Sequence, residues 1–581
     1  MRHLSLLSFL FLSLVSHAQD RILVDGIFDE WDAYSIIYTD ATGDDGFSGV
    51  DFGQLKIYND EKFLFLSLEV GTEINIQDMN NISIYLETDD DASTGFSING
   101  IGADLIYRFG NREGTFYGGG NSYFISHYDI GLINAPTVAS DRFEIAISRD
   151  ATVFGNSVFQ SDKIKVVFRD DFSSGDLIPN TNDEAEYSFL NEDLEPLPNY
   201  SIQKPPTSDL RILSYNVLFD GLFDSSREAA FTRILQATQP DIIGFQEIYD
   251  NSSEQVATQI ALMTGTQWYH AKQGPDCHAI SRYPIIESAF IAGYNQGAGN
   301  GAFLIDLPGV AEHLLMIVAH PPCCSNDFGR QIEVDLIMEF LREAKNGNGP
   351  FPLEENARIV IVGDMNFVGD GGQLETLLTG DIADESSYGA DFNPDWDGND
   401  LLDSHPYATG VPFSYTWYSP NSSFSPGRLD YIIYSGSNLN LQNSYSLFTP
   451  ALPQETLNTF NLNANDVITA SDHLPVVADF KIENFSVPTE DFVEDNIGFL
   501  KVSPNPSFGL TEVSFSMHQQ DFVDIQLINQ DGKEVKILQR KNMSPGENTI
   551  QLDTSDIPAG MYFVRMKTAE FVLAEKLVIL K

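Results

Sequence analysis

The sequence predicts a chain of three folded parts: a β-sandwich, a central α/β domain with helices packed outside its β-sheets, and a C-terminal immunoglobulin-like β-sandwich. Its 581 residues exceed what one hydrophobic core organises, so several domains are expected. Pro-rich residues 195–207 and acidic residues 483–498 have the composition of linkers. Only between these linkers do strands rich in β-branched residues alternate with helical patterns. This division places the three parts at residues 20–194, 208–482 and 499–581.

The composition is that of a folded but strongly acidic protein. Hydrophobic residues make up 42% and aromatic residues 12% of the chain, which is enough for sizeable cores. The formal net charge is -52, and residues 208–482 alone contain 11 Lys and Arg against 35 Asp and Glu. Such a surface repels polyanions, whereas non-specific nucleic-acid binding needs Lys and Arg. We interpret the charge as a solubility feature.

The first residues have the pattern of an export signal. Arg2 and His3 precede an apolar run at residues 4–15, and residues 16–18 (Ser-His-Ala) offer a small-x-small cleavage site. The apolar run is too short to span a bilayer. We therefore expect a signal peptide at residues 1–18, an exported mature protein and no transmembrane segment.

The chain has three cysteines, Cys277, Cys323 and Cys324. Export to an oxidising compartment would permit a disulfide bond between two of them. The odd number leaves at least one thiol over if a pair forms, and a bond from Cys277 to Cys323 or Cys324 is one option that the sequence does not decide. Without paired spacings the three make a poor zinc signal. The sequence does not give the oligomeric state either.

The first part, residues 20–194, alternates short apolar strands with Asp, Asn and Gly turns. Strands are predicted at residues 63–70, 82–87, 105–109 and 143–148. The opening Ile-Leu-Val-Asp-Gly-Ile-Phe-Asp-Glu-Trp of residues 22–31 resembles family 9 carbohydrate-binding modules. That resemblance implies polysaccharide as a partner, and a spacer sandwich without a ligand is an equal alternative. Residues 89–91, three aspartates, form either a Ca²⁺ site or a solvated acidic turn.

The central part begins with a strand at residues 210–217. Ser225 and Glu228 are expected to form a capping box before an apolar helix that Pro240 ends. A second amphipathic helix is predicted at residues 329–344. Further strands are predicted at residues 241–246, 358–362, 429–434 and 475–480.

Polar side chains with catalytic potential stand at the ends of these strands. One such residue is an ordinary strand terminator, but a repeated placement predicts a converging polar cluster. The set comprises Asn216, Glu247, His320, Asp364, Asn366, Asp430, Asp472 and His473.

The residue types in this set suit metal-assisted attack on a phosphate. Glu247, Asp472 and Asn216 offer oxygen ligands of the kind that Mg²⁺ or Mn²⁺ prefers. A paired His473 and Asp430 would fix the imidazole tautomer and raise its basicity.

The other members would act at the phosphate itself. Asp364 would orient a water for in-line attack, and Asn366 would donate to the pentacoordinate intermediate.

These stretches resemble the endonuclease/exonuclease/phosphatase superfamily, which includes deoxyribonuclease I-like enzymes, over residues 210–480. The matching motifs, in the family's order, are Ser-Tyr-Asn216, Phe-Gln-Glu247, Gly-Asp364-Met-Asn366, Arg428-Leu-Asp430-Tyr and Ser471-Asp-His473. The resemblance implies a four-layer fold, two β-sheets between helices, with the site at one edge. It implies Glu247 and Asp472 as metal ligands with Asn216 nearby, and it places His320 where such enzymes carry a second catalytic histidine. Arg428 is expected either to order Asp430 or to contact the phosphate.

An acidic insertion at residues 391–400 has alternating acids before Gly398. Asp395 and Asp397 in this insertion are candidates for a structural Ca²⁺ site, and a solvated acidic turn is the alternative.

The last part has the pattern of a secretion signal. Residues 499–506, 557–565 and 576–581 together resemble the type A sorting domain of the type IX secretion system. The resemblance implies the type IX machinery as a partner and a secreted or cell-surface location.

The sequence therefore predicts a secreted, divalent-metal-dependent phosphoesterase of the hydrolase class. Nucleic acid, a lipid headgroup or a small phosphodiester are the candidate substrates, so a nuclease is one option. The alternative from another class is a non-catalytic, polysaccharide-binding surface protein.

Overall fold

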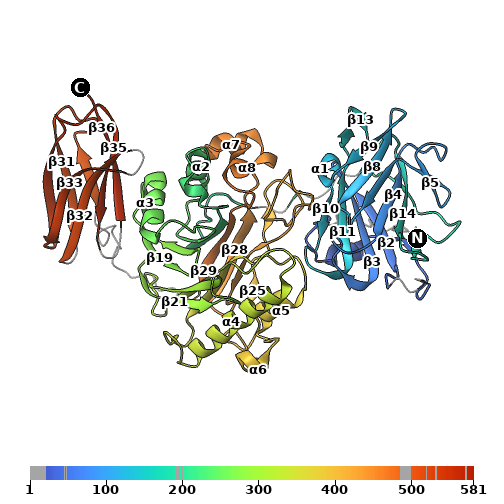
Figure 1. Cartoon of the computed structure of the whole chain (residues 1–581), viewed down its shortest axis with the longest axis horizontal. Coiled ribbons are helices and arrows are strands. Elements are labelled where there is room, and N and C mark those ends of the chain that lie inside the picture. Colours follow the sequence, from blue (N-terminus) through green and yellow to red (C-terminus); the bar gives the residue numbers. More distant parts are fainter. Residues whose placement is uncertain are drawn as a thin grey trace, which may run out of the picture.

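The computed structural model describes residues 21–44, 46, 49–191, 196–197, 200–483, 499–517, 520–529, 533–568 and 572–581. The expected signal peptide at residues 1–18 lies outside these residues, as do residues 484–498 of the second expected linker and residues 195, 198 and 199 of the first. Figure 1 shows three bodies in chain order, with the α/β body between two β-rich ones. Among the described residues, no helix has both the length and the apolar character needed to cross a membrane.

The N-terminal body consists of two antiparallel sheets around one core. The first has the order β1 (Ile36–Thr39), β2 (Gln54–Asn59), β3 (Phe63–Ile74), β11 (Ser140–Ser148) and β10 (Ile133–Ala135). The second has the order β15 (Leu177–Ile178), β14 (Lys163–Asp170), β4 (Ile82–Glu87), β7 (Leu105–Arg108), β8 (Glu113–Gly118) and β9 (Asn121–Ile125), with β16 (Glu186–Ser188) beside β14. Smaller elements are η1 (Asp29–Ala33), α1 (His127–Ile130) and the pairs β5 (Phe96–Ile98) with β6 (Ile101–Ala103) and β12 (Thr152–Val153) with β13 (Asn156–Ser157). Side chains of both sheets, such as Leu66 and Ile84, share the buried core.

The central body has four layers, two sheets between two sets of helices. One sheet has the order β19 (Tyr269–Gln273), β20 (Cys277–Ser281), β18 (Ile242–Gln246), β17 (Leu210–Asn216), β29 (Val476–Ile482), β28 (Leu439–Ser446) and β26 (Tyr407–Ala408). The other has the order β21 (Ile285–Ala292), β22 (Gly299–Ile305), β23 (Leu314–Ala319), β24 (Arg358–Asp364), β27 (Asp430–Tyr434) and β25 (Leu402–Asp403). Their facing side chains, such as Ile212 and Val360, form a fully buried inner core.

The helices cover the outer faces of these sheets. α2 (Glu228–Thr238), α3 (Ser253–Thr264), α7 (Gln454–Phe460) and α8 (Asp466–Ala470) share a core with the first sheet. α4 (Asp327–Lys345) and α5 (Gly372–Thr379) share another with the second sheet, next to the short α6 (Glu385–Tyr388). The 3-10 turns η2 (Gly221–Phe223) and η3 (Thr449–Ala451) complete this body.

The start of α2 differs from the prediction. The expected capping box of Ser225 and Glu228 is wrong, because Arg227 is the N-cap residue and no side chain caps the helix. Asp224 instead accepts hydrogen bonds from the backbone and hydroxyl of Ser226, which forms a turn before the helix. A capping box does form at α3, between Ser252 and Gln255.

The C-terminal body contains two further antiparallel sheets around a separate core. Their orders are β30 (Leu500–Ser503), β31 (Leu510–Met517) and β34 (Gly546–Asp553), and β33 (Glu534–Met543), β32 (Asp521–Asn529), β35 (Gly560–Lys567) and β36 (Val572–Ile579). Trp268 at the start of β19 forms a bridge with Val572.

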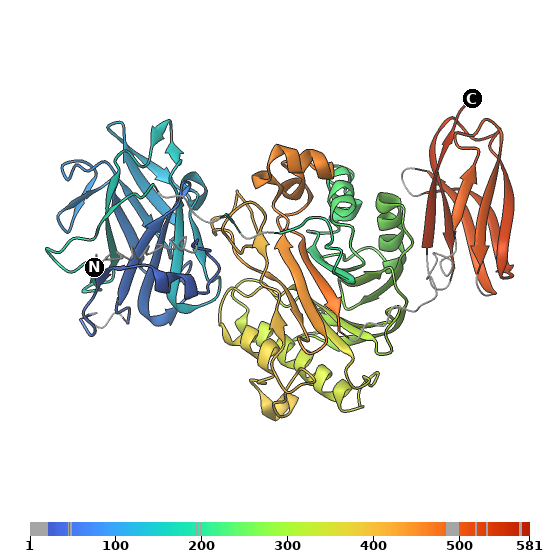
Figure 2. The ribbon, with the colours of Figure 1, turned by 180° about the vertical axis from the view of Figure 1, so that it is seen from behind.

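The N-terminal body packs directly on the central one, against loops drawn in yellow to orange (Figure 2). Val24 forms a parallel bridge with Phe413, and the ring of Phe63 lies 4.8 Å from that of Phe413 in an edge contact. Buried side chains of both bodies, including Trp31 and Tyr415, belong to one hydrophobic cluster. The two bodies therefore share a core at their junction.

A buried ion pair fixes the register of β17 against β29. Arg211 and Asp479 are opposite one another in the two strands, and the guanidinium donates two hydrogen bonds of 2.7 Å to the carboxylate. The third nitrogen of Arg211 donates to the carbonyls of Ile202 and Thr238 at 2.6 Å. Both charged side chains are fully buried, so removal of one leaves the other without compensation.

We predict that Asp479→Ala lowers the free energy of unfolding by about 3–5 kcal/mol, because the Arg211 charge then stays buried without a partner. Chemical denaturation followed by tryptophan fluorescence measures the change. The control is Glu186→Ala, which removes a carboxylate from an exposed pair with Lys163 and should cost less than about 1 kcal/mol. Equal effects of the two substitutions would contradict the assigned role of the buried pair.

Candidate active site at one edge of the paired sheets

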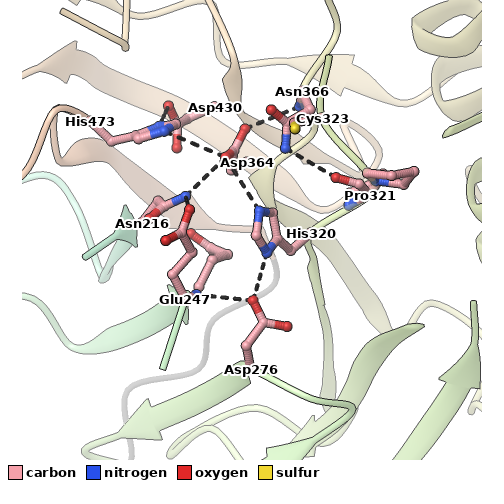
Figure 3. Close-up of polar contacts among 12 residues, drawn as sticks. Asn216, Glu247, Asp276, His320, Pro321, Cys323, Asp364, Asn366, Asp430 and His473 are labelled. Carbon is pink, nitrogen blue, oxygen red and sulfur yellow. Dashed lines mark hydrogen bonds and ion pairs between the residues drawn. The ribbon is translucent and has the colours of Figure 1, made fainter. Parts of the chain in front are cut away.

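Strand direction explains why the predicted residues meet. β17 runs parallel to β18, and β23 runs parallel to β24, so the ends of these strands lie at one edge of each sheet. β29 and β27 are antiparallel to those strands and begin at the same edge, where Asp430 is opposite Asp364. Figure 3 shows side chains from these strands pointing toward Asp364.

The carboxylate of Asp364 lies at the centre of the cluster and is 2% exposed. Its Oδ2 accepts a hydrogen bond of 2.9 Å from Asn216. Nε2 of His473 and Nε2 of His320 lie 3.5 Å and 3.6 Å from the same oxygen. Burial raises the pKa of Asp364, and the charge of His473 opposes that shift.

A glycine makes this arrangement sterically feasible. Gly363 has φ +152°, and a Cβ there would lie 1.9 Å from the carbonyl oxygen of Ala319 in the neighbouring strand. The residue before Asp364 therefore has to be glycine for β23 and β24 to stay paired.

His473 is held by a buried acid. Its Nδ1 lies 2.9 Å from Oδ2 of Asp430, which also accepts a hydrogen bond from the Thr416 hydroxyl at 2.7 Å. Burial disfavours the charged imidazole, but Asp430 and Asp364 outweigh it and raise the pKa of His473 to about 10. This contact orients the ring with Nε2 toward Asp364.

His320 has a partner that the sequence did not reveal. Its Nδ1 lies 2.6 Å from Oδ2 of Asp276, and the same oxygen accepts a hydrogen bond of 3.0 Å from the backbone of Glu247. Burial opposes the charge on His320, yet Asp276 and Asp364 raise its pKa to about 9. Asp276 stands alone in the turn before β20, so no spacing pattern marked it.

Two of the residues predicted as metal ligands, Asn216 and Glu247, lie beside this centre. Asn216 donates a second hydrogen bond, of 3.0 Å, to Oε1 of Glu247, and Glu247, His320 and Asp364 each place a ligand atom within 4.8 Å of the others. Oδ1 of Asp472 is buried and has no hydrogen-bond partner among the described residues, while Oδ2 accepts from Trp417. Carboxylate and amide oxygens of this kind suit Mg²⁺ or Mn²⁺, so the residues present fit a divalent cation.

Asn366 and Arg428 have different surroundings. Asn366 lines the same cleft, and its side chain donates to the carbonyl of Pro321 at 3.0 Å. The Arg428 guanidinium instead contacts Asp403 at 2.5 Å and His405 at 3.0 Å. The expected contact of Arg428 with phosphate or with Asp430 finds no support in this geometry.

The candidate Ca²⁺ loop is satisfied without an ion. Asp395 accepts hydrogen bonds from the backbone and hydroxyl of Ser437, and Asp397 accepts from Asn399. The ammonium group of Lys345 donates to the carbonyls of residues 393, 394 and 395, which are the oxygens that a cation in this loop would use. Lys345 therefore supplies the positive charge of this loop.

The cysteines pair in a way that the sequence left open. Cys323 and Cys324 are bonded to one another, three residues after His320, and both line the cleft. Cys277 is buried and free.

The cluster around Asp364 opens into a cleft of about 1020 Å³. Glu247, Asp276, His320, Asp364 and His473 line it. A volume of this size accommodates a small organic molecule beside the candidate catalytic side chains.

Two family models match parts of this chain. Residues 213–473 match the model of the Endonuclease/Exonuclease/phosphatase family, and residues 501–580 match that of a secretion system C-terminal sorting domain. A comparison with curated protein sequences returns no match.

Among solved structures, humanized TDP2 from D. rerio is 16% identical, with 47% of this chain and 98% of that chain covered and a TM-score of 0.32. The human Nocturnin catalytic domain is 16% identical, with 48% and 96% covered and a TM-score of 0.31. Sphingomyelinase C from Streptomyces griseocarneus is 15% identical, with 47% and 99% covered and a TM-score of 0.30.

The family matches confirm the resemblances predicted for the central and C-terminal parts, and the sorting domain indicates a secreted or cell-surface protein. The resemblance of the first part to family 9 carbohydrate-binding modules stays a prediction. Residues 213–473 form a domain of the Endonuclease/Exonuclease/phosphatase family, and residues 501–580 form a type IX secretion sorting domain.

Proposed function

We propose that this protein is a secreted, divalent-metal-dependent phosphoesterase that hydrolyses a phosphodiester or phosphomonoester by in-line attack of water. The observation that carries the proposal is the approach of Asn216, His320 and His473 to one buried carboxylate, Asp364, in a large cleft. Three partners around one carboxylate, two of them imidazoles, are suited to proton transfer. The match to a family of nucleases and phosphatases supports the same reaction class.

Glu247, Asp472 and Asn216 are the residues that would hold Mg²⁺ or Mn²⁺, a role that the orphaned Oδ1 of Asp472 supports. The bound ion would supply charge neutralisation at the phosphoryl oxygens and at the leaving oxygen.

The side chains of the chain itself would position water and phosphate. Asp364 Oδ2 would accept the proton of the attacking water as the new P–O bond forms and the bond to the leaving oxygen breaks. His473, fixed by Asp430, would hold a proton at Nε2 beside that carboxylate. His320, fixed by Asp276, would donate from Nε2 to a phosphate oxygen.

No observation on the described residues favours the alternative of a non-catalytic, polysaccharide-binding surface protein.

We predict that His473→Ala lowers kcat/KM by about 10²–10⁴, the usual contribution of general acid–base catalysis. The measurement is release of p-nitrophenol from thymidine 5′-(p-nitrophenyl phosphate) and from p-nitrophenyl phosphate, each with Mg²⁺ and with Mn²⁺. The control is His313→Ala, because His313 contacts Glu354 and does not line the cleft. A His473→Ala protein as active as the control would remove His473 from the mechanism.

We predict that chelation with EDTA abolishes turnover and that added Mg²⁺ or Mn²⁺ restores it. Glu247→Gln should raise the Mn²⁺ concentration for half-maximal activity by at least about tenfold, because a ligand charge is lost. Isothermal titration with Mn²⁺ gives the same affinity without reference to activity. Glu287→Gln, an exposed carboxylate on β21, is the matched control and should leave the Mn²⁺ affinity unchanged. Full activity after exhaustive chelation would contradict the proposed metal dependence.

A further inference from the structure

We propose that the N-terminal body is a fixed wall of the catalytic cleft and that this cleft selects esters with a single phosphate and an uncharged, apolar or aromatic substituent. The inference rests on the proposed phosphoesterase function and names its substrate class.

Polar contacts lock the wall to the loop before Asp430. The backbone of Ser425 donates to the side chain of Gln77 at 2.8 Å, and the Ser425 hydroxyl donates to Asn134 at 2.6 Å. The backbone of Arg428 donates to the hydroxyl of Thr137 at 2.8 Å. The side chains of Gln77, Asn134 and Ser425 are buried, and that of Thr137 is partly exposed. The contact therefore excludes water.

A second set of contacts holds the loop that follows Asn366. The side chain of Asn75 donates to the carbonyl of Val368 at 2.5 Å, and the backbone of Ala139 donates to the carbonyl of Gly369 at 2.7 Å. Both loops that leave the active-site edge toward the N-terminal body are thus attached to it. A rigid wall follows from these attachments, because all except the contact of the Ser425 hydroxyl with Asn134 use a backbone group.

This wall presents both apolar and polar side chains to the cleft. Ile74, Gln77, Asp78 and Met79 line the cleft, and Met79 is 96% exposed. The central body contributes aromatic side chains to the same cleft. These are Phe219, Tyr249, Tyr294, Trp417 and Phe424. Exposed apolar side chains around a concave site favour a ligand with apolar surface.

Charge argues against a second phosphate. Among the described residues that line the cleft, none is Lys or Arg. Asp78 and Asp327 add carboxylates outside the candidate catalytic cluster, and these are in ion pairs with Arg112 and Arg330. The nearby Arg112 is engaged, since it donates to the carbonyl of Gln77 and stacks over the ring of Phe424 at 4.1 Å. The ammonium group of Lys272 donates to three backbone carbonyls.

One phosphate would meet the metal and the histidines, but a further phosphate would find no Lys or Arg among the described residues that line the cleft. Polynucleotide binding depends on Lys and Arg at the phosphates. The cleft therefore suits a compact ester with one phosphate, and its aromatic lining suits a ring or hydrocarbon substituent.

A matched pair of substrates tests the charge argument. Thymidine 5′-(p-nitrophenyl phosphate) and its 3′-phosphorylated form share one leaving group and differ only in the second phosphate. We expect the second phosphate to lower kcat/KM by about tenfold or more, mainly through KM. p-Nitrophenyl phenyl phosphate, which has one phosphate and an aromatic substituent, should be turned over at least as well as the monophosphate nucleoside ester.

Substitution of the wall tests its location. Met79→Lys places a cation on the wall and should reduce, by several-fold, the factor by which the second phosphate lowers kcat/KM. Phe124→Lys is the control, because Phe124 is 72% exposed on β9 and does not line the cleft. If the second phosphate lowers kcat/KM by the same factor in the two variants, the proposed wall is wrong. If the bisphosphate ester is turned over as fast as the monophosphate ester, the proposed substrate class is wrong. No turnover of any of the three esters would instead refute the proposed function.

Discussion

The buried carboxylate of Asp364 constrains the whole edge of the two sheets at which the candidate site lies. The Asp364 carboxylate sits at the end of a central strand, and burying it costs free energy unless partners compensate. Those partners come from both sheets, since Asn216 ends a strand of one sheet, His473 precedes another strand of that sheet, and His320 follows a strand of the other. The compensation therefore exists only when the two sheets are packed in the observed register. Folding of the central body and assembly of the site are one event in this sense.

The same dependence extends beyond the central body. The loops that follow Asn366 and precede Asp430 are hydrogen bonded to the N-terminal body, and a hydrophobic cluster crosses the junction. A loop that is held by hydrogen bonds at both ends loses less conformational entropy when a substrate binds than a loop held at one end. The N-terminal body thus acts as structural support for the active-site edge, whatever further ligand it binds.

Much of this site could be predicted from the sequence because each strand carries its polar residue immediately at its end. Strand direction then brings Glu247, Asp364 and His473 together without knowledge of loop paths. Asp276 was missed because it reaches His320 across sequence-distant strands, and nothing local distinguishes it from an ordinary turn aspartate. The partner of Arg428 was missed for the same reason. The wall of the cleft could not be foreseen either, since domain docking depends on surface shape and not on a local pattern.

Anomalous diffraction from crystals grown with Mn²⁺ tests the central claim most directly, because it locates the ion without reference to activity. The account predicts one strong Mn²⁺ peak at Glu247 and Asp472, next to the Asp364 carboxylate. The described residues include another acidic group, Asp40, Asp44 and Asp176 in the N-terminal body, which serves as an internal comparison. A peak at that group, with none beside Glu247, would contradict the account.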